Sequence, residues 1–204
     1  MRSILAILAA SLALALGTVH PAVAQRPSEL GGAQLDSKPA DSGLPGGFHG
    51  LSPGSPGLPW VPLQPAGAGF RVEMPGVATP SQQKVTVTAT GEVVDQYEHS
   101  VVIDSVEYFV AHTLYRRMPP ELTPDQILVN GRNGRKGTLL SDRRLTVSGA
   151  AAREYVHDQD GAIFVTRASY AGNTLYQLIV VGPPGVENQP NTRRFLDSFA
   201  LVGR

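Results

Sequence analysis

A nearly uniform apolar run lies close to the C-terminal end of the chain. Residues 175–181 (LYQLIVV) contain one strongly polar residue, Gln177, and Gly-Pro-Pro-Gly follows at residues 182–185. An apolar run bounded by turn residues predicts a buried strand with a sharp exit. After the turn, Phe195, Leu196 and Phe199 share one face at helical spacing. They predict a helix over residues 190–198 that packs against the sheet.

Shorter alternating runs precede this strand. They predict strands over residues 70–74, 84–90, 93–103, 106–114, 139–147, 151–157 and 163–171, with a short terminal strand over 199–202. Turn residues such as Asp104-Ser105 and Gly172-Asn173 separate neighbouring runs. Connections this short permit only antiparallel neighbours.

One more helix is predicted between these strands. Thr123, Pro124 and Gln126 fit a capping box with proline at the first helical position, so the helix begins at Pro124. Its glycine-rich end predicts termination near Arg135. Two helices against a six- to eight-stranded, mainly antiparallel sheet indicate an α+β domain over residues 70–204.

The N-terminal residues have the pattern of a cleaved bacterial signal peptide. Arg2 precedes an apolar stretch over residues 4–16, and Ala22-Val23-Ala24 fits a cleavage site before Gln25. We therefore expect residues 1–24 to be removed and the protein to be periplasmic or secreted. No later apolar run approaches about 18 residues, so we expect no membrane span after cleavage.

A Pro/Gly-rich segment over residues 25–69 follows. Residues 26–69 hold eight prolines and ten glycines, and their apolar residues occur singly. This composition predicts a disordered linker. Trp60, the single tryptophan, lies within it. It is a candidate docking residue for a partner; the alternative is an aromatic side chain that folds back on the domain.

Composition excludes several kinds of chemistry. The chain has no cysteine, which excludes disulfides, thiolate metal sites and cysteine nucleophiles. Seventeen Lys and Arg residues balance 17 Asp and Glu residues, so the basic surplus typical of nucleic-acid binders is missing. No catalytic motif is evident: Ser141 and Ser198 lie in neither a G-x-S-x-G nor an S-x-x-K pattern. We therefore expect no enzyme activity and no cofactor.

Two features could still bind a ligand. His99 and His112 fall on neighbouring predicted strands and would form part of a metal site if they converged; surface or half-buried histidines are the alternative. The sequence GRNGRKG at residues 131–137 places cations between glycines, where free backbone amides could hold an anion. The alternative is a basic helix end beside the negative pole of its dipole. The candidate anion-binding residues are Gly131, Arg132, Gly134, Arg135 and Lys136.

Four stretches resemble a recurring family of bacterial secreted domains with the PsbP-like α/β sandwich fold. They are FRVEMPG, LLSDRRLTVSGAAAREY, LYQLIVVGPPG and RRFLDSFAL, within residues 70–201. The shared motifs are structural and bring no catalytic residues with them. The resemblance implies an adaptor or accessory role by analogy.

Together these features predict an exported, non-catalytic binding or accessory module of the cell envelope, tethered by a flexible stalk. Its expected partner is an envelope protein or a polyanionic component, and not nucleic acid. Two alternatives remain open. One is an envelope hydrolase or metal-dependent enzyme that uses His99 and His112, and the other is a structural spacer. No sequence feature sets the oligomeric state.

Overall fold

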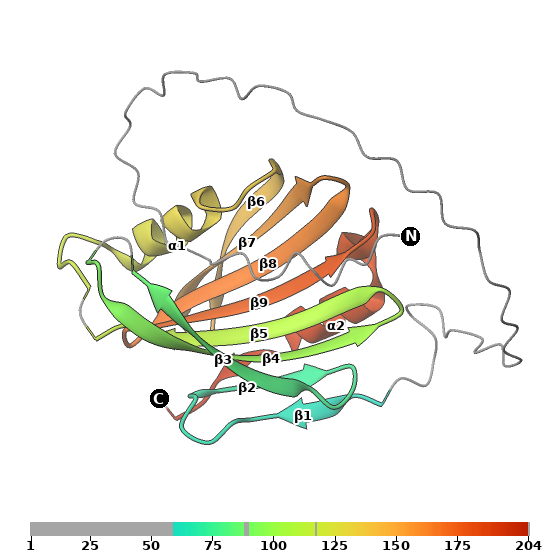
Figure 1. Cartoon of the computed structure of the whole chain (residues 1–204), viewed down its shortest axis with the longest axis horizontal. Helices are drawn as coiled ribbons and strands as arrows, with labels where there is room; N and C mark the ends of the chain where they lie inside the picture. The colour runs from blue at the N-terminus through green and yellow to red at the C-terminus, as the bar shows by residue number, and fades with distance from the viewer. Residues whose placement is uncertain (1–58, 88–89, 117, 204) are drawn as a thin grey trace, which may run out of the picture. The chain divides into compact units, whose positions relative to one another are not determined.

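The computed structural model of the protein describes residues 59–87, 90–116 and 118–203. The expected signal peptide and residues 25–58 of the expected linker lie outside the described residues. A seven-stranded antiparallel sheet dominates, with the order β3-β4-β5-β9-β8-β7-β6 (Figure 1). Its strands are β3 (Thr79–Thr86), β4 (Val93–Ile103), β5 (Val106–Leu114), β6 (Thr138–Val147), β7 (Ala150–Gln159), β8 (Ala162–Ala171) and β9 (Thr174–Gly182).

A smaller sheet contains β1 (Val61–Leu63), β2 (Phe70–Met74) and β10 (Ala200–Leu201), in the order β1-β2-β10. The prediction places β2 and β10 in one sheet with the other strands and does not include β1. β2 instead buries Phe70, Val72 and Met74 in the main core. This strand stabilises the fold through its apolar face, while its backbone pairs with β1 and β10. The mainly antiparallel α+β prediction is confirmed.

The first helix, α1 (Pro124–Asn133), begins at the predicted capping box. The Thr123 hydroxyl accepts a hydrogen bond from the Gln126 backbone N–H at 3.3 Å, and the Gln126 side chain accepts one from the Thr123 backbone N–H at 2.8 Å. The helix ends before Gly134, slightly earlier than predicted. None of the helices in the described ranges is long and apolar enough to cross a membrane.

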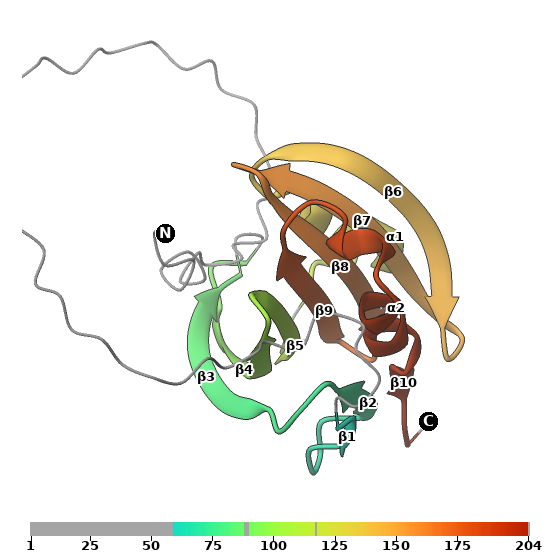
Figure 2. The same ribbon diagram turned by 90° about the vertical axis from the view of Figure 1, so that its right-hand side faces the viewer.

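The second helix, α2 (Pro190–Asp197), follows a short 3-10 turn, η2 (Val186–Asn188). The two α-helices lie on opposite faces of the larger sheet (Figures 1 and 2). The alternation of side chains along β7 shows how one sheet packs against both helices. Tyr155 packs with Ile127 of α1, whereas Val156 belongs to the core that contains Phe195 of α2. Successive strand residues point to opposite faces, so β7 contributes to both cores.

The folded part begins earlier than the linker prediction allowed. Strand β1 lies within residues 25–69 and pairs with β2 through Val61 opposite Met74. Ala68 is buried in the core, and Trp60 packs against its edge. The Arg194 guanidinium lies 4.5 Å from the centre of the Trp60 ring. The predicted boundary at residue 69 is therefore wrong, and Trp60 contacts its own domain.

Two-residue turns join four pairs of neighbouring strands. Their residues are Asp104-Ser105, Ser148-Gly149, Asp160-Gly161 and Gly172-Asn173, each with positive φ. This conformation matches the twist of antiparallel hairpins. The third strand begins at Thr79, earlier than predicted, because Pro80 is tolerated at the edge of a sheet.

Replacing Gly137 with alanine is expected to lower the free energy of unfolding by about 1–3 kcal/mol, and further if the backbone cannot shift. Gly137 has a φ of +97°, and an added Cβ would lie 2.2 Å from the backbone oxygen of Asp158. Gly149 is the matched control: its φ is +79°, but no atom lies within 4 Å of an added Cβ. Urea denaturation compares the two variants. A Gly137 variant no less stable than the Gly149 variant would contradict the close approach.

Candidate functional site

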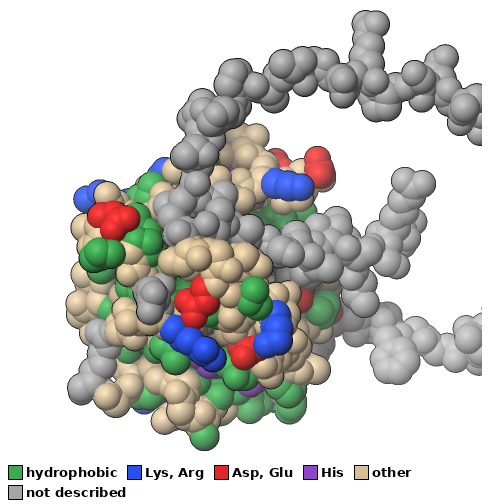
Figure 3. All heavy atoms as spheres, turned by 60° about the vertical axis from the view of Figure 1, so that its left-hand side comes forward, with side chains coloured by type: hydrophobic (Ala, Val, Ile, Leu, Met, Phe, Trp, Pro, Cys, Tyr) green, Lys and Arg blue, Asp and Glu red, His purple; other side chains and the backbone are tan. Residues whose placement is uncertain are grey.

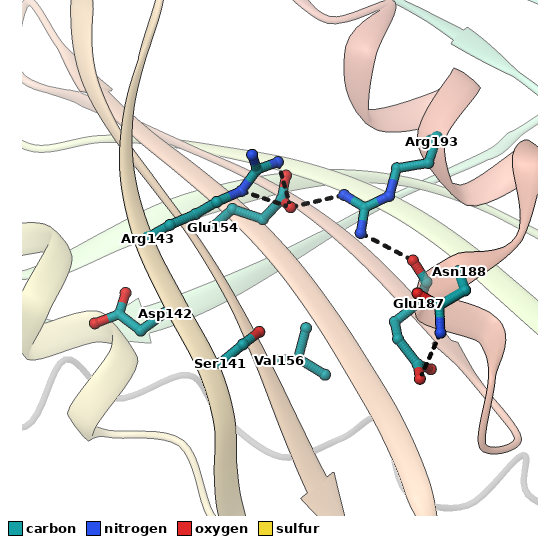
Figure 4. Close-up of a pocket in the computed structure, with 8 residues that line it drawn as sticks. All are labelled: Ser141, Asp142, Arg143, Glu154, Val156, Glu187, Asn188 and Arg193. Atoms are coloured by element: carbon teal, nitrogen blue, oxygen red, sulfur yellow. Dashed lines mark hydrogen bonds and ion pairs between the residues drawn. The ribbon is translucent and has the colours of Figure 1, made fainter.

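A pocket of about 470 Å³ opens between β6, β7 and the segment that contains η2 and α2 (Figure 4). Most of the side chains that line it are polar or charged. They are Ser141, Asp142, Arg143, Glu154, Val156, Glu187, Asn188 and Arg193. In Figure 4 the Asp142 carboxylate points away from the others. The charged side chains that face the pocket are therefore those of Arg143, Glu154, Glu187 and Arg193.

Glu154 connects these elements. It lies opposite Arg143 on β6 and opposite Arg167 on β8. Its Oε1 accepts hydrogen bonds from Arg143 Nη2 and from Arg193 Nη1, each at 2.8 Å. Its Oε2 accepts from Arg167 Nε at 2.9 Å and from Arg167 Nη2 at 2.6 Å. One carboxylate thus holds three guanidinium groups, which come from two strands and a helix.

This arrangement keeps Glu154 ionised. Burial is the largest single influence on the carboxyl group and opposes ionisation. Hydrogen bonds from Arg193, Arg167 and Arg143 outweigh burial and lower the pKa of Glu154 to about 2. A general acid or base needs a pKa near the working pH. Glu154 therefore acts as a fixed negative charge that orients the arginines.

Arg167 continues the network towards α2. Its Nη1 donates to the backbone oxygen of Leu196 at 2.7 Å, and its Nη2 donates to Asp197 Oδ1 at 2.8 Å. A cation near the last carbonyl groups of a helix is favourable because the helix dipole is negative there. The same network that shapes the pocket therefore fixes α2 on the sheet.

The sequence-predicted anion loop is arranged differently from the prediction. Gly131 is buried as part of α1, and Gly134 has right-handed backbone geometry with a φ of −73°, whereas Gly137 has a φ of +97° and lies close to the backbone of Asp158. Arg132 donates to Asp142, which Arg153 also contacts at 2.6 Å. Lys136 is exposed. Arg135 lies with its guanidinium carbon 5.6 Å from the centre of the Phe164 ring.

His99 and His112 lie on the same face of the β4–β5 pair. Tyr97 is opposite His112 and Val110 is opposite His99, which makes the two histidines diagonal neighbours. The His112 ring stacks on Tyr97 with a centroid distance of 5.2 Å and lies 5.6 Å from Phe70. Within the described ranges, no three His, Asp or Glu side chains are placed to hold a metal ion. The observed role of His112 is aromatic contact between the two sheets.

The histidines are expected to make the fold less stable in mild acid. Burial lowers the pKa of His99, His112 and His157. The nearby His99 lowers the pKa of His112 further, and the positive charges of Arg135 and Arg132 lower the pKa of His157 further. The unfolded chain takes up protons from about pH 6.5 downward, before the folded chain does. The free energy of unfolding should therefore fall as pH drops below about 6.5. The lowered pKa values of Glu154 and Asp142 add a further loss below about pH 4.

Urea denaturation at a series of pH values checks this expectation. A triple variant, His99→Gln, His112→Gln and His157→Gln, is the control and should lose the step near pH 6.5 while it keeps the step in stronger acid. A parent protein whose stability does not change between about pH 7 and 5 would contradict the assignment of histidines whose pKa values are lowered by burial or partial burial.

Sequence reasoning missed Glu154, Arg167 and Arg193 as candidate site residues. A signal was present: Glu154 falls on the same strand face as Ala152 and Val156, and both neighbours are core residues. A charged residue on an otherwise apolar strand face indicates an internal ion pair. Its partners lie 13 and 39 residues away in sequence, so only the strand register and the position of α2 identify them.

Figure 3 turns the left-hand side of Figure 1 forward and shows charged side chains of the described residues on that side. In Figure 3, acidic and basic side chains occur singly or close to one another among hydrophobic and other side chains. Among the described residues, Lys84 of β3 and Asp95 of β4 form an exposed ion pair with an N–O distance of 3.1 Å.

No family model matches the sequence, and no curated protein matches it significantly. Similar solved structures include cyanobacterial PsbP (CyanoP) from Synechocystis sp. PCC 6803, with 12% identity over 76% of this chain and 100% of that chain, and a TM-score of 0.44. Another is a protein of unknown function from Pseudomonas aeruginosa, with 12% identity over 71% of this chain and 97% of that chain, and a TM-score of 0.39. Similarities at this level carry no weight for function.

Proposed function

We propose that this protein is an exported, non-catalytic binding module of the cell envelope that holds an acidic group of a partner protein in the Glu154 pocket. The observation that carries the proposal is the pair Arg143 and Arg193, aligned at an open pocket by one buried carboxylate. The sequence resemblance to PsbP-like domains favours the same accessory role by analogy.

The two arginines retain unused donors. Arg143 bonds Glu154 through Nε and Nη2, and Arg193 bonds Glu154 and the Glu187 backbone oxygen through its two Nη atoms. In the described part of the chain, Arg143 Nη1 and Arg193 Nε make no hydrogen bond. The Arg143 side chain is 61% exposed. These two guanidinium groups are already held in place and still have free donors, which suits the binding of a carboxylate. Little side-chain conformational entropy would be lost on binding, because the arginines are ordered beforehand.

The preference for an acidic ligand group rests on the unused donors of Arg143 and Arg193 and not on the net charge of the pocket. Three guanidinium groups (Arg143, Arg167 and Arg193) are matched by three carboxylates (Glu154, Asp197 and Glu187), so the formal charges of the pocket and its network balance. Glu187 lies on the other side of the pocket and accepts hydrogen bonds from Gly185 and Asn188. The volume of about 470 Å³ is large enough for one or two side chains of a peptide segment.

Binding, rather than reaction, fits the chemistry of this pocket. Glu154 stays ionised, and both of its oxygens are engaged by arginines. The Ser141 hydroxyl, which also lines the pocket, has no hydrogen bond to an imidazole among the described residues. An activated serine needs such a base. The pocket thus supplies fixed donors, and neither Glu154 nor Ser141 is poised for proton transfer.

The test is capture of a partner from envelope extract by the immobilised exported protein. We expect a partner that the parent and an Arg116→Gln control retain, and that the double variant Arg143→Gln, Arg193→Gln releases. Arg116 is a matched cation because it is 84% exposed and pairs only at 4.0 Å with Glu92. Thermal melting confirms that each variant is folded. If the double variant retained the partner as well as the parent does, the pocket would be excluded as the binding site. If the parent captured no partner at all, the structural-spacer alternative would be favoured.

Export is checked separately. N-terminal sequencing of the protein recovered outside the cytoplasm is expected to begin at Gln25, because Ala22-Val23-Ala24 fits a signal-peptidase site. Recovery of the protein with residue 1 retained would contradict cleavage. The metal content of the same preparation tests the enzyme alternative, since a metal bound in a fixed ratio and lost in a His99→Gln, His112→Gln variant would favour it.

A further inference from the structure

Strand β6 forms one edge of the larger sheet. Among the described strands it pairs only with β7, and Figure 2 shows it as the outermost strand on that side of the sheet. It runs from Thr138 to Val147, and most of its residues are exposed. An edge strand of this length presents backbone N–H and C=O groups that can pair with a further strand.

The two edges of the sheet differ in how well they resist such pairing. The opposite edge, β3, carries Pro80 and Lys84, and both residue types discourage pairing at an edge. Strand β6 contains neither proline nor lysine. Its irregularity is confined to the bulge at Leu140, where the register with β7 shifts. Residues 141–147 keep a continuous register and form a regular template.

The hairpin turn after β6 indicates which backbone groups face the open edge. Ser148 and Gly149 form a two-residue turn with positive φ, so Val147 and Ala150 are expected to form the hydrogen-bonded pair that closes it. Hydrogen-bonded and non-hydrogen-bonded pairs alternate along an antiparallel ladder. Three residues of β6 therefore direct their backbone N–H and C=O groups away from β7: Asp142, Arg144 and Thr146.

The ion pairs along this edge have their cations outermost. Arg143 pairs with Glu154 at 2.8 Å, and their side chains are 61% and 5% exposed. Arg144 pairs with Asp125 at 2.7 Å, and these side chains are 74% and 39% exposed. Successive strand residues point to opposite faces, so the edge presents one exposed guanidinium group on each face. Acidic residues of an added strand would lie favourably opposite both arginines.

A second copy of β6 does not match this edge. Antiparallel pairing of two identical strands has a two-fold axis perpendicular to the sheet, which places one residue opposite itself. With the axis at Asp142, Arg143 or Arg144, like charges lie directly opposite each other and destabilise the pair. An acidic segment of another protein is therefore the better occupant.

We propose that a partner protein adds an extended acidic segment to β6 as an antiparallel strand. Two consecutive acidic residues of that segment lie opposite Arg144 and Arg143, and apolar residues flank them opposite Leu145 and beside the exposed Leu140. Backbone hydrogen bonds to β6 supply affinity, and the side-chain positions supply specificity. The residue opposite Arg143 faces the Glu154 pocket, so this inference rests on the proposed function and specifies how the partner presents its acidic group.

Calorimetric titration of the purified exported protein with the peptide TVEETTLT tests strand addition. We expect saturable binding that Thr146→Pro weakens by at least about fivefold, because proline removes an N–H that faces the added strand and none that faces β7. Thr146→Ala is the matched control, since it keeps this N–H and changes only a side chain outside the proposed contacts. It should bind within about twofold of the parent.

Amide hydrogen exchange in the unchanged protein keeps the test decisive if Thr146→Pro does not fold. The peptide should slow exchange at the N–H groups of Asp142, Arg144 and Thr146, which gain partners. The N–H of Leu145 already faces β7 and should change little.

The proposal is overturned if TVEETTLT does not bind saturably, if the two Thr146 variants bind it equally, or if the exchange rates at β6 do not change. Equal binding of the neutral peptide TVQQTTLT would overturn the acidic assignment. A dimer of the protein that Thr146→Pro dissociates would show that a second copy occupies the edge.

The double variant Arg143→Gln, Arg193→Gln separates this inference from the proposed function. If the double variant binds the peptide as the parent does and Thr146→Pro does not, strand addition stands and the pocket is excluded. If the double variant loses the peptide and Thr146→Pro keeps it, the pocket stands and strand addition is excluded.

Discussion

Replacement of Glu154 by alanine is expected to lower the free energy of unfolding by about 3–5 kcal/mol. Glu154 and Arg167 are both buried, with side chains 5% and 8% exposed, and each needs the other to offset its loss of hydration. Removal of the carboxylate leaves the Arg167 charge inside the core and frees Arg143 and Arg193. Urea denaturation at neutral pH measures the loss, since urea does not screen charges.

Asp197→Ala is the matched control for this prediction. Asp197 also accepts a hydrogen bond from Arg167, at 2.8 Å, but its side chain is 65% exposed. Exposed ion pairs contribute little, so the control should lose less than about 1 kcal/mol. If the two variants were equally stable, Glu154 would not be the group that balances the buried arginine, and the interpretation of the network would fail.

Replacement of Phe195 by alanine is expected to cost about 3–5 kcal/mol, because the side chain leaves a cavity in a close-packed core. Phe195 has no exposed surface, and its ring meets Tyr108 of β5 edge-on at a centroid distance of 5.6 Å. It fixes α2 to the larger sheet. The midpoint of urea denaturation should therefore shift strongly, whereas Phe195→Leu should cost less than about 1.5 kcal/mol if the core can repack.

Leu114→Ala provides the surface control for Phe195. Leu114 lies at the end of β5 and is 57% exposed, so its loss should change stability by no more than about 0.5 kcal/mol. A Phe195→Ala midpoint that coincides with that of the surface control would show that the helix face is not buried in solution.

Local sequence signals predicted most secondary structure. The Thr123 capping box determines where α1 begins, because its hydrogen bonds form between residues three positions apart. The hairpin turns are equally local, as Asp104-Ser105 shows with positive φ at both residues. The face of α2 was also predictable, since Phe195 and Leu196 are both fully buried.

The candidate sites were less predictable. Arg132, Arg135 and Lys136 are close in sequence, yet they separate into an ion pair with Asp142, a partly buried guanidinium over Phe164 and an exposed side chain. Sequence proximity gives the composition of a loop but not the direction of each side chain. Those directions depend on the strands beneath the loop.

The sequence by itself determined most of the strands, the two α-helices and an α+β class, because hydrophobic alternation, caps and turns act over a few residues; it did not predict β1. Only the tertiary structure decided that β1 and β2 form a separate sheet and that Glu154 lies among Arg143, Arg167 and Arg193. These contacts join residues 11 to 39 positions apart. Strand register and the position of α2 bring these residues together, so that the buried carboxylate of Glu154 and the buried guanidinium of Arg167 are paired. No local sequence pattern contains this information, because the partners come from different strands and a helix.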